Sequence, residues 1–129
     1  MKRLALIIAF ACSFAVGCGP TDPLHATTVQ LGRSLNSDNS VGTFATRFKP
    51  DDTIHIAVLT DKPGRGTFKV RWTFRGQSIN EEERSVSYRD EAATEFHINY
   101  PGGLPPGDYK VDVQLDDMPA GMREFVVEK

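Results

Sequence analysis

The sequence predicts an all-β fold, an antiparallel two-sheet sandwich of seven to eight strands. Two observations lead to this prediction. Apolar and polar residues alternate with a period of two in several separate runs, which is typical of strands that bury one face. Clusters of Pro, Gly and Asp separate these runs and favour tight turns. No run after the first 28 residues shows a convincing helical period.

The first 17 residues have the features of a secretory signal peptide. Lys2 and Arg3 provide the positive charge, and Leu4–Val16 is an uncharged run of thirteen residues. A membrane-spanning helix needs roughly 17–25 apolar residues, so this run is too short to span a bilayer and fits the central region of a signal peptide.

Cys18 is the predicted site of lipid attachment. The residues Ala15-Val16-Gly17-Cys18 resemble the lipobox of bacterial lipoproteins, whose Cys is acylated and becomes the first residue. The box usually has Leu where this chain has Ala15. The alternative is an ordinary signal peptide with a free Cys nearby. Lipidation explains why the mature chain has a single, unpaired Cys.

The segment 18–28 is expected to hold the lipidated Cys and a tether, and 29–129 to form the sandwich. Gly19–Thr28 has two Pro and little apolar content, and its ten residues can reach about 33 Å. In the lipoprotein family, Asp after the Cys typically retains the protein in the inner membrane. Gly19 therefore implies the outer membrane, facing the periplasm, if the source has two membranes.

The strands follow from the alternating runs. Gln77–Glu83 has capping-box spacing at its start but no apolar helical stripe, so it is interpreted as an edge strand. The other expected strands lie at Val29–Leu35, Thr43–Phe48, Ile54–Leu59, Phe68–Phe74, Arg84–Tyr88, Glu95–Tyr100, Tyr109–Leu115 and Arg123–Val127.

Two aromatic residues sharpen the prediction to an immunoglobulin-like sandwich. Trp72 lies in the third long strand, where that fold places a core aromatic. Tyr109 opens the penultimate strand, where the fold often has a tyrosine corner whose hydroxyl bonds to nearby backbone. The Cys pair of antibody domains is absent, so no antibody relationship is implied.

The stretch from Gly42 to Val127 resembles a group of uncharacterised bacterial lipoproteins with immunoglobulin-like domains. The resemblance implies fold and location, and brings no activity or catalytic residue with it. It is carried by Phe48–Ile54, Trp72–Thr73, Glu95–Ile98, Leu104–Val111 and Phe125–Val127.

Charge and motifs exclude several function classes. Without Lys2 and Arg3 the chain has 13 basic and 17 acidic side chains, a formal charge of −4, which argues against nucleic acid as a partner. Membrane attachment is therefore assigned to the acyl anchor. Motifs for a nucleophilic Ser, a zinc protease, a dithiol or a phosphate-binding loop are absent, so we expect no enzyme and no cofactor.

His55 and His97 are candidate metal ligands. Both lie in the polar phase of their strands, and these strands are neighbours in an immunoglobulin-like sheet. Together with a carboxylate the pair would suit zinc. The alternative is that both are ordinary residues of a half-exposed sheet surface.

Lys69, Arg71 and Arg75 are candidate binding residues. Three cations on one face of one strand would suit an acidic glycan or a partner's carboxylates. The alternative is pairing with acids of the neighbouring strand, such as Asp112 and Asp116.

Three acidic turns are expected at one end of the sandwich: Asp61–Gly66, Asp90–Ala93 and Asp116–Gly121. They are either a calcium site or solvated turn residues. If the first two strands form a simple hairpin, the tether enters at the opposite end.

We therefore expect a membrane-anchored lipoprotein that displays a non-catalytic binding or assembly module to an envelope protein or glycan. The alternative function is a periplasmic carrier of a ligand or metal, using a sandwich face or the end loops.

Overall fold

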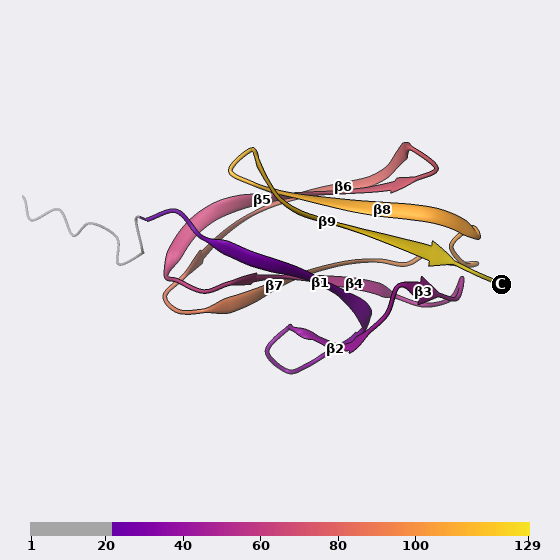
Figure 1. Cartoon of the computed structure of the whole chain (residues 1–129), viewed down its shortest axis with the longest axis horizontal. Coiled ribbons are helices and arrows are strands. Elements are labelled where there is room, and N and C mark those ends of the chain that lie inside the picture. Colours follow the sequence, from indigo (N-terminus) through magenta and orange to yellow (C-terminus); the bar gives the residue numbers. More distant parts are fainter. Residues whose placement is uncertain (1–21) are drawn as a thin grey trace, which may run out of the picture.

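The computed structural model describes residues 22–129, and the predicted signal peptide and Cys18 lie outside this range. Nine strands pack as two layers (Figure 1). The strands are β1 (Ala26–Leu35), β2 (Val41–Phe44), β3 (Arg47–Phe48), β4 (Ile54–Thr60), β5 (Gly64–Phe74), β6 (Gln77–Tyr88), β7 (Ala92–Ile98), β8 (Gly107–Leu115) and β9 (Met118–Val127). No helix long and apolar enough to cross a bilayer occurs in residues 22–129.

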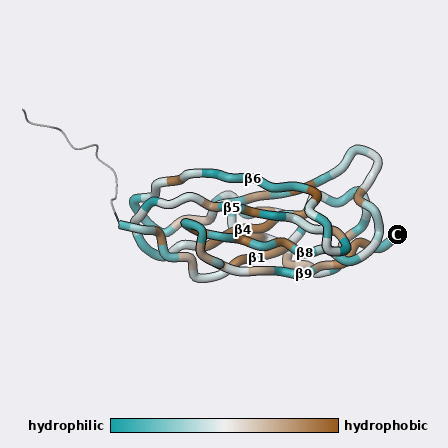
Figure 2. The backbone as a smooth tube through the Cα atoms, turned by 90° about the horizontal axis from the view of Figure 1, so that it is seen from above, coloured by the Kyte–Doolittle hydropathy of each residue, from teal (hydrophilic) through white to brown (hydrophobic). Residues whose placement is uncertain are grey.

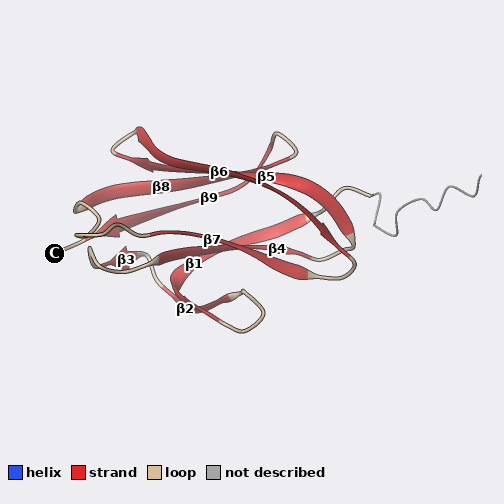
Figure 3. Cartoon of the chain, turned by 180° about the vertical axis from the view of Figure 1, so that it is seen from behind, coloured by secondary structure: helices blue, strands red, loops and turns tan. Residues whose placement is uncertain are grey.

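The two layers form an immunoglobulin-like sandwich, as predicted. One sheet has the order β2-β1-β4-β7 and the other β3-β9-β8-β5-β6 (Figure 3). The pairing is antiparallel except between β3 and β9, which are parallel. Because side chains alternate between the faces of a strand, each sheet turns an apolar face toward the other.

The core contains both predicted aromatic residues. Trp72 is buried on β5 and meets Phe125 of β9 edge-on, with ring centroids 6.0 Å apart. Tyr109 is buried at the start of β8, and its hydroxyl donates to the Pro105 carbonyl oxygen at 2.6 Å. This is the tyrosine corner that the sequence predicted.

The segment expected as one strand, Thr43–Phe48, is divided between the sheets. β2 belongs to the first sheet, whereas β3 pairs with β9 in the second. Burial explains the division: Phe44 is 64% exposed, whereas Phe48 is buried with its ring 5.4 Å from that of Phe125. The described residues form nine strands, against the seven to eight predicted.

The expected edge strand and the run after it form one long strand, β6. Its twelve residues pair with β5 at the rim of the second sheet. Most of β6 is coloured hydrophilic in Figure 2, which fits a strand with few buried residues.

The sequence predicts that the folded domain starts at Val29, but the domain begins earlier in the chain. β1 begins at Ala26, Leu24 is only 6% exposed, and Pro23 bridges to Arg65. Backbone hydrogen bonds join Arg65 to Asp22 and to Leu24, at 2.9 and 3.1 Å. The last part of the expected tether is therefore a component of the sandwich.

The chain enters at the same end as the acidic turns, which corrects the expectation of opposite ends. Ala26 at the start of β1 pairs with Thr60 at the end of β4. The reason is an extra reversal: β1 bends back near Gly32, and the turn at 36–40 returns toward the entry end (Figure 1). A Cβ at Gly32 would lie 2.0 Å from the Thr43 carbonyl oxygen, so this close approach requires glycine.

Candidate functional site

The predicted site residues are distributed over both sheets. His55 and His97 lie on the outer face of the first sheet, and Lys69 and Arg71 on that of the second. Arg75 lies in the turn after β5. Cys18 lies outside the described residues.

The two histidines are direct neighbours across the β4–β7 ladder. His55 and His97 are register partners, and their ring centroids are 5.6 Å apart. Because register partners share a face of the sheet, both imidazoles point away from the core. The proximity expected from the sequence is therefore present.

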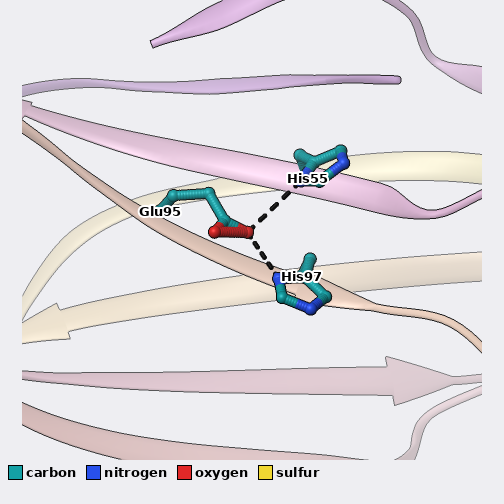
Figure 4. Close-up of side chains that lie close together, drawn as sticks. All are labelled: His55, Glu95 and His97. Carbon is teal, nitrogen blue, oxygen red and sulfur yellow. Dashed lines mark hydrogen bonds and ion pairs between the residues drawn. The ribbon is translucent and has the colours of Figure 1, made fainter. Parts of the chain in front are cut away.

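Glu95 joins the two histidines into a cluster, called the His–Glu–His cluster below. Its Oε1 lies 3.2 Å from Nδ1 of His55 and 2.6 Å from Nδ1 of His97 (Figure 4). The side chains of His55 and Glu95 are 17% and 18% exposed, whereas that of His97 is 53% exposed. Two ligands are thus shielded and the third faces solvent.

Segments of β1 and β6 lie next to the cluster. Gly32 of β1 is the register partner of His55, and β2 crosses the outer face of the sheet at that point. On the other side, Arg84 of β6 donates to the Glu95 carbonyl oxygen at 2.9 Å and also pairs with Glu82. The nearby guanidinium charge is therefore balanced by a carboxylate of its own strand.

Glu95 could have been predicted from the sequence as the carboxylate of the cluster. It stands two residues before His97, and this spacing places both on one face of a strand. The expectation required a carboxylate beside the histidines but did not identify it.

Lys69 and Arg71 are engaged in ion pairs. Arg71 Nε lies 3.3 Å from Oε2 of Glu81 on β6, and Lys69 Nζ lies 3.9 Å from Oδ1 of Asp117. Asp112 is the register partner of Arg71 but pairs with Lys110, at 3.6 Å. Pairing of these cations with acids was the expected alternative to ligand binding. The acids involved are Glu81 and Asp117, whereas Asp112 and Asp116 were expected.

The expectation that Arg75 continues the cationic stripe is wrong. Arg75 and Gly76 have φ of 49° and 82° and form the tight turn between β5 and β6. Positive φ at both central residues matches the twist of a hairpin. Arg75 lies over the Phe74 ring, 5.0 Å from its centroid.

Arg75 instead borders a shallow hollow of about 620 Å³ at the end of the sandwich opposite the chain entry. Arg47 of β3 and Lys110 of β8 also line it, with the acids Asp108 and Glu124. Lys69 and Arg71 line a separate, smaller hollow of about 360 Å³.

The acidic end residues have individual structural contacts. Asp116 Oδ1 accepts from the Thr67 backbone N–H at 2.9 Å. Asp61 forms a 2.8 Å hydrogen bond with His25, which holds the pKa of the Asp61 carboxyl below its ordinary value of 3.8. In residues 22–129, the His–Glu–His cluster is the one group of three or more His, Cys, Asp or Glu side chains whose ligand atoms lie close enough together to hold a metal ion. The calcium interpretation of the turns gains no support from this geometry.

Comparison with known proteins supports the fold. An immunoglobulin-like protein from Pseudomonas aeruginosa superposes with a TM-score of 0.54 at 12% identity, covering 87% of this chain and all of that one. No family model and no curated protein matches the sequence.

Two further solved structures are similar at TM-scores below 0.5, too low to support inferences here. A CARDB domain from Pyrococcus furiosus in complex with di-metal ions has a TM-score of 0.47 at 14% identity, over 84% of this chain and 90% of that one. A β-glucosidase from Listeria innocua has a TM-score of 0.48 at 13% identity, over 81% of this chain and 16% of the enzyme.

Proposed function

We propose that the chain is a lipoprotein, anchored through Cys18, that displays a non-catalytic immunoglobulin-like binding or assembly module in the cell envelope. The observation that supports this most is the fastening of residues Asp22 to His25 onto one end of the sandwich. A chain fixed there presents the domain in one orientation.

The orientation follows from chain length. Asp22 is four residues after Cys18, a reach of about 14 Å at most. An acylated Cys18 would therefore hold the acidic turns close to the bilayer. The opposite end, with the C-terminus and the hollow beside Arg75, would face away from it (Figure 1).

The outward end offers a surface for a partner. Arg47, Arg75 and Lys110 border the hollow there. Arg47 pairs with Glu128 and Lys110 with Asp112, so Arg75, which lies over the Phe74 ring, is the cation that best suits a carboxylate of an envelope protein or an acidic glycan. A photo-reactive side chain at position 75 should cross-link to the partner, whereas one at exposed Lys62, near the entry end, should not. Cross-links formed at position 62 alone would contradict this arrangement.

The anchor is tested by fractionation in a two-membrane host. The wild-type chain should be recovered with membranes because it carries the acyl chains, and with the outer membrane because Gly19 stands where the retention signal has Asp. Cys18→Ser should remove the protein from membranes, whereas Cys12→Ser, the matched control, should leave it there. Membrane recovery of Cys18→Ser equal to that of wild type would refute the anchor.

Carriage of a ligand or metal is the second candidate function. It is favoured by one observation, the convergence of His55, Glu95 and His97 on the outer face of the first sheet.

A further inference from the structure

We propose that His55, Glu95 and His97 form a binding site for one divalent transition-metal ion of the Zn²⁺ type. Each side chain offers one ligand atom, and these atoms all lie within 4.8 Å of one another. The inference concerns the outer face of the first sheet and does not depend on the anchor at Cys18.

The ligand spacing is close to what the ion requires. Tetrahedral Zn²⁺ with ligands at roughly 2.0–2.1 Å needs ligand atoms about 3.3 Å apart. Glu95 Oε1 is 3.2 Å from His55 Nδ1 and 2.6 Å from His97 Nδ1. The distance between Glu95 and His97 must therefore lengthen when the ion binds, and the ligand atoms of the two histidines lie within 4.8 Å of each other.

The backbone holds the ligands in place. His55 and His97 are register partners in the β4–β7 ladder, and Glu95 is two residues from His97 on the same strand and face. A rigid ladder reduces the conformational freedom that ligands lose on binding an ion. The sheet therefore presents a largely preformed set of three ligands.

The donor chemistry selects the class of ion. Two imidazoles and one carboxylate suit Zn²⁺ and similar transition metals. Ca²⁺ takes six to eight oxygen ligands, and this cluster offers one carboxylate. His97 is half-exposed, so water can complete the coordination shell from the solvent side.

The competing interpretation is a hydrogen-bonded trio in which Glu95 accepts from both histidines and binds no metal. The two interpretations differ in one measurable property, saturable binding of Zn²⁺ that depends on each of the three residues. His25 provides a matched control because it also pairs with a carboxylate, Asp61 at 2.8 Å, without a third ligand.

The test is isothermal titration of the untagged full chain in detergent with ZnCl₂. The parent chain for this test carries Cys12→Ser and Cys18→Ser so that no thiol binds the metal, and every variant is made in this parent chain. We expect one Zn²⁺ per chain, and His97→Ala should weaken binding at least about tenfold. Glu95→Gln should do the same, while His25→Ala and an added excess of CaCl₂ should leave binding unchanged.

The outcomes are separable from misfolding. Because His97 is half-exposed, His97→Ala should keep the circular dichroism spectrum and unfolding midpoint of the metal-free chain. Added Zn²⁺ should raise the unfolding midpoint of the parent chain and of His25→Ala, but not of His97→Ala. No binding at tens of micromolar Zn²⁺, or equal affinity of His97→Ala and the parent chain, would overturn the proposal.

Discussion

Tyr109 connects the loop before β8 to the core through a single hydroxyl. Its ring stacks on Phe125, with centroids 5.1 Å apart, while its O–H donates to the Pro105 carbonyl oxygen at 2.6 Å. The ring supplies packing and the hydroxyl fixes the position of the loop.

Tyr109→Phe removes the hydrogen bond and keeps the ring. We expect a loss of about 0.5–1.5 kcal/mol in the free energy of unfolding, measured by urea denaturation. Tyr100→Phe is the control, because Tyr100 is 52% exposed and should change stability by less than about 0.5 kcal/mol. Equal changes in the free energy of unfolding for the two variants would show that the hydrogen bond of the Tyr109 hydroxyl does not stabilise the fold.

Burial raises the pKa of the Tyr109 phenol above its ordinary value of 10.0. The folded chain therefore binds the phenolic proton more tightly than the unfolded chain does. This contribution to stability is complete below pH 10 and is lost as the pH rises through the folded-state pKa. Ultraviolet titration of tyrosinate should show ionisation of Tyr109 at a higher pH in the native protein than in urea, and the reverse order would contradict the burial.

Residues whose role depends on local position could be predicted from the sequence. Trp72 and Tyr109 were placed correctly because the fold assigns their positions relative to strand starts. Arg75 was misplaced because alternation continues past the end of β5, and the turn at Arg75–Gly76 is visible only in the backbone angles.

At the scale of elements, the N-terminal segment has an unexpected structural role. Leu24 belongs to the core cluster although it precedes β1 and lies in what the sequence predicted to be tether. The segment around Leu24 has two Pro and few apolar residues, so its composition gave no sign that this side chain would be buried.

Leu24→Ala should destabilise the domain by about 2–5 kcal/mol, because it leaves a cavity among buried residues. Urea unfolding of the full chain measures this change. His25→Ala, at the exposed neighbouring position, should cost less than about 1 kcal/mol because its pair with Asp61 is exposed. If both variants lose the same small amount, Leu24 is not part of the core.

Alternation identified β4, β5, β7 and β8 because each has buried residues at alternate positions along much of its length. In β9 only Phe125 and Val127 are buried, so alternation identified only the end of that strand. The division of 43–48 between the sheets could not be found in the same way. It depends on contact of Phe48 with Phe125, far along the chain. The bend of β1 at Gly32 likewise depends on the approach of β2.

At the scale of the whole molecule, the bend in β1 decides which end of the sandwich faces the anchor. A simple hairpin would have put the chain entry opposite the acidic turns. The extra reversal places Ala26 beside Thr60, at the same end as those turns. With an anchor at Cys18, as proposed, the end that carries Arg75 and the C-terminus would be the one open to partners.

The His–Glu–His cluster lies on a sheet face away from the end that carries Arg75, so the proposed metal ion and the proposed partner would not compete for one surface. The sequence predicted the nearness of His55 and His97 because neighbouring strands were inferred correctly. The partial burial of His55 was not predictable, because the alternating pattern placed it in the polar phase of its strand.

The central claim is that Cys18 becomes the lipidated first residue of the mature chain. Intact mass spectrometry of the protein extracted from membranes tests this most directly. We expect the mass of residues 18–129 plus that of covalent acyl groups, with the acyl groups located on the N-terminal peptide after proteolysis. A mature chain that begins elsewhere, or one whose Cys18 is unmodified, would contradict the account.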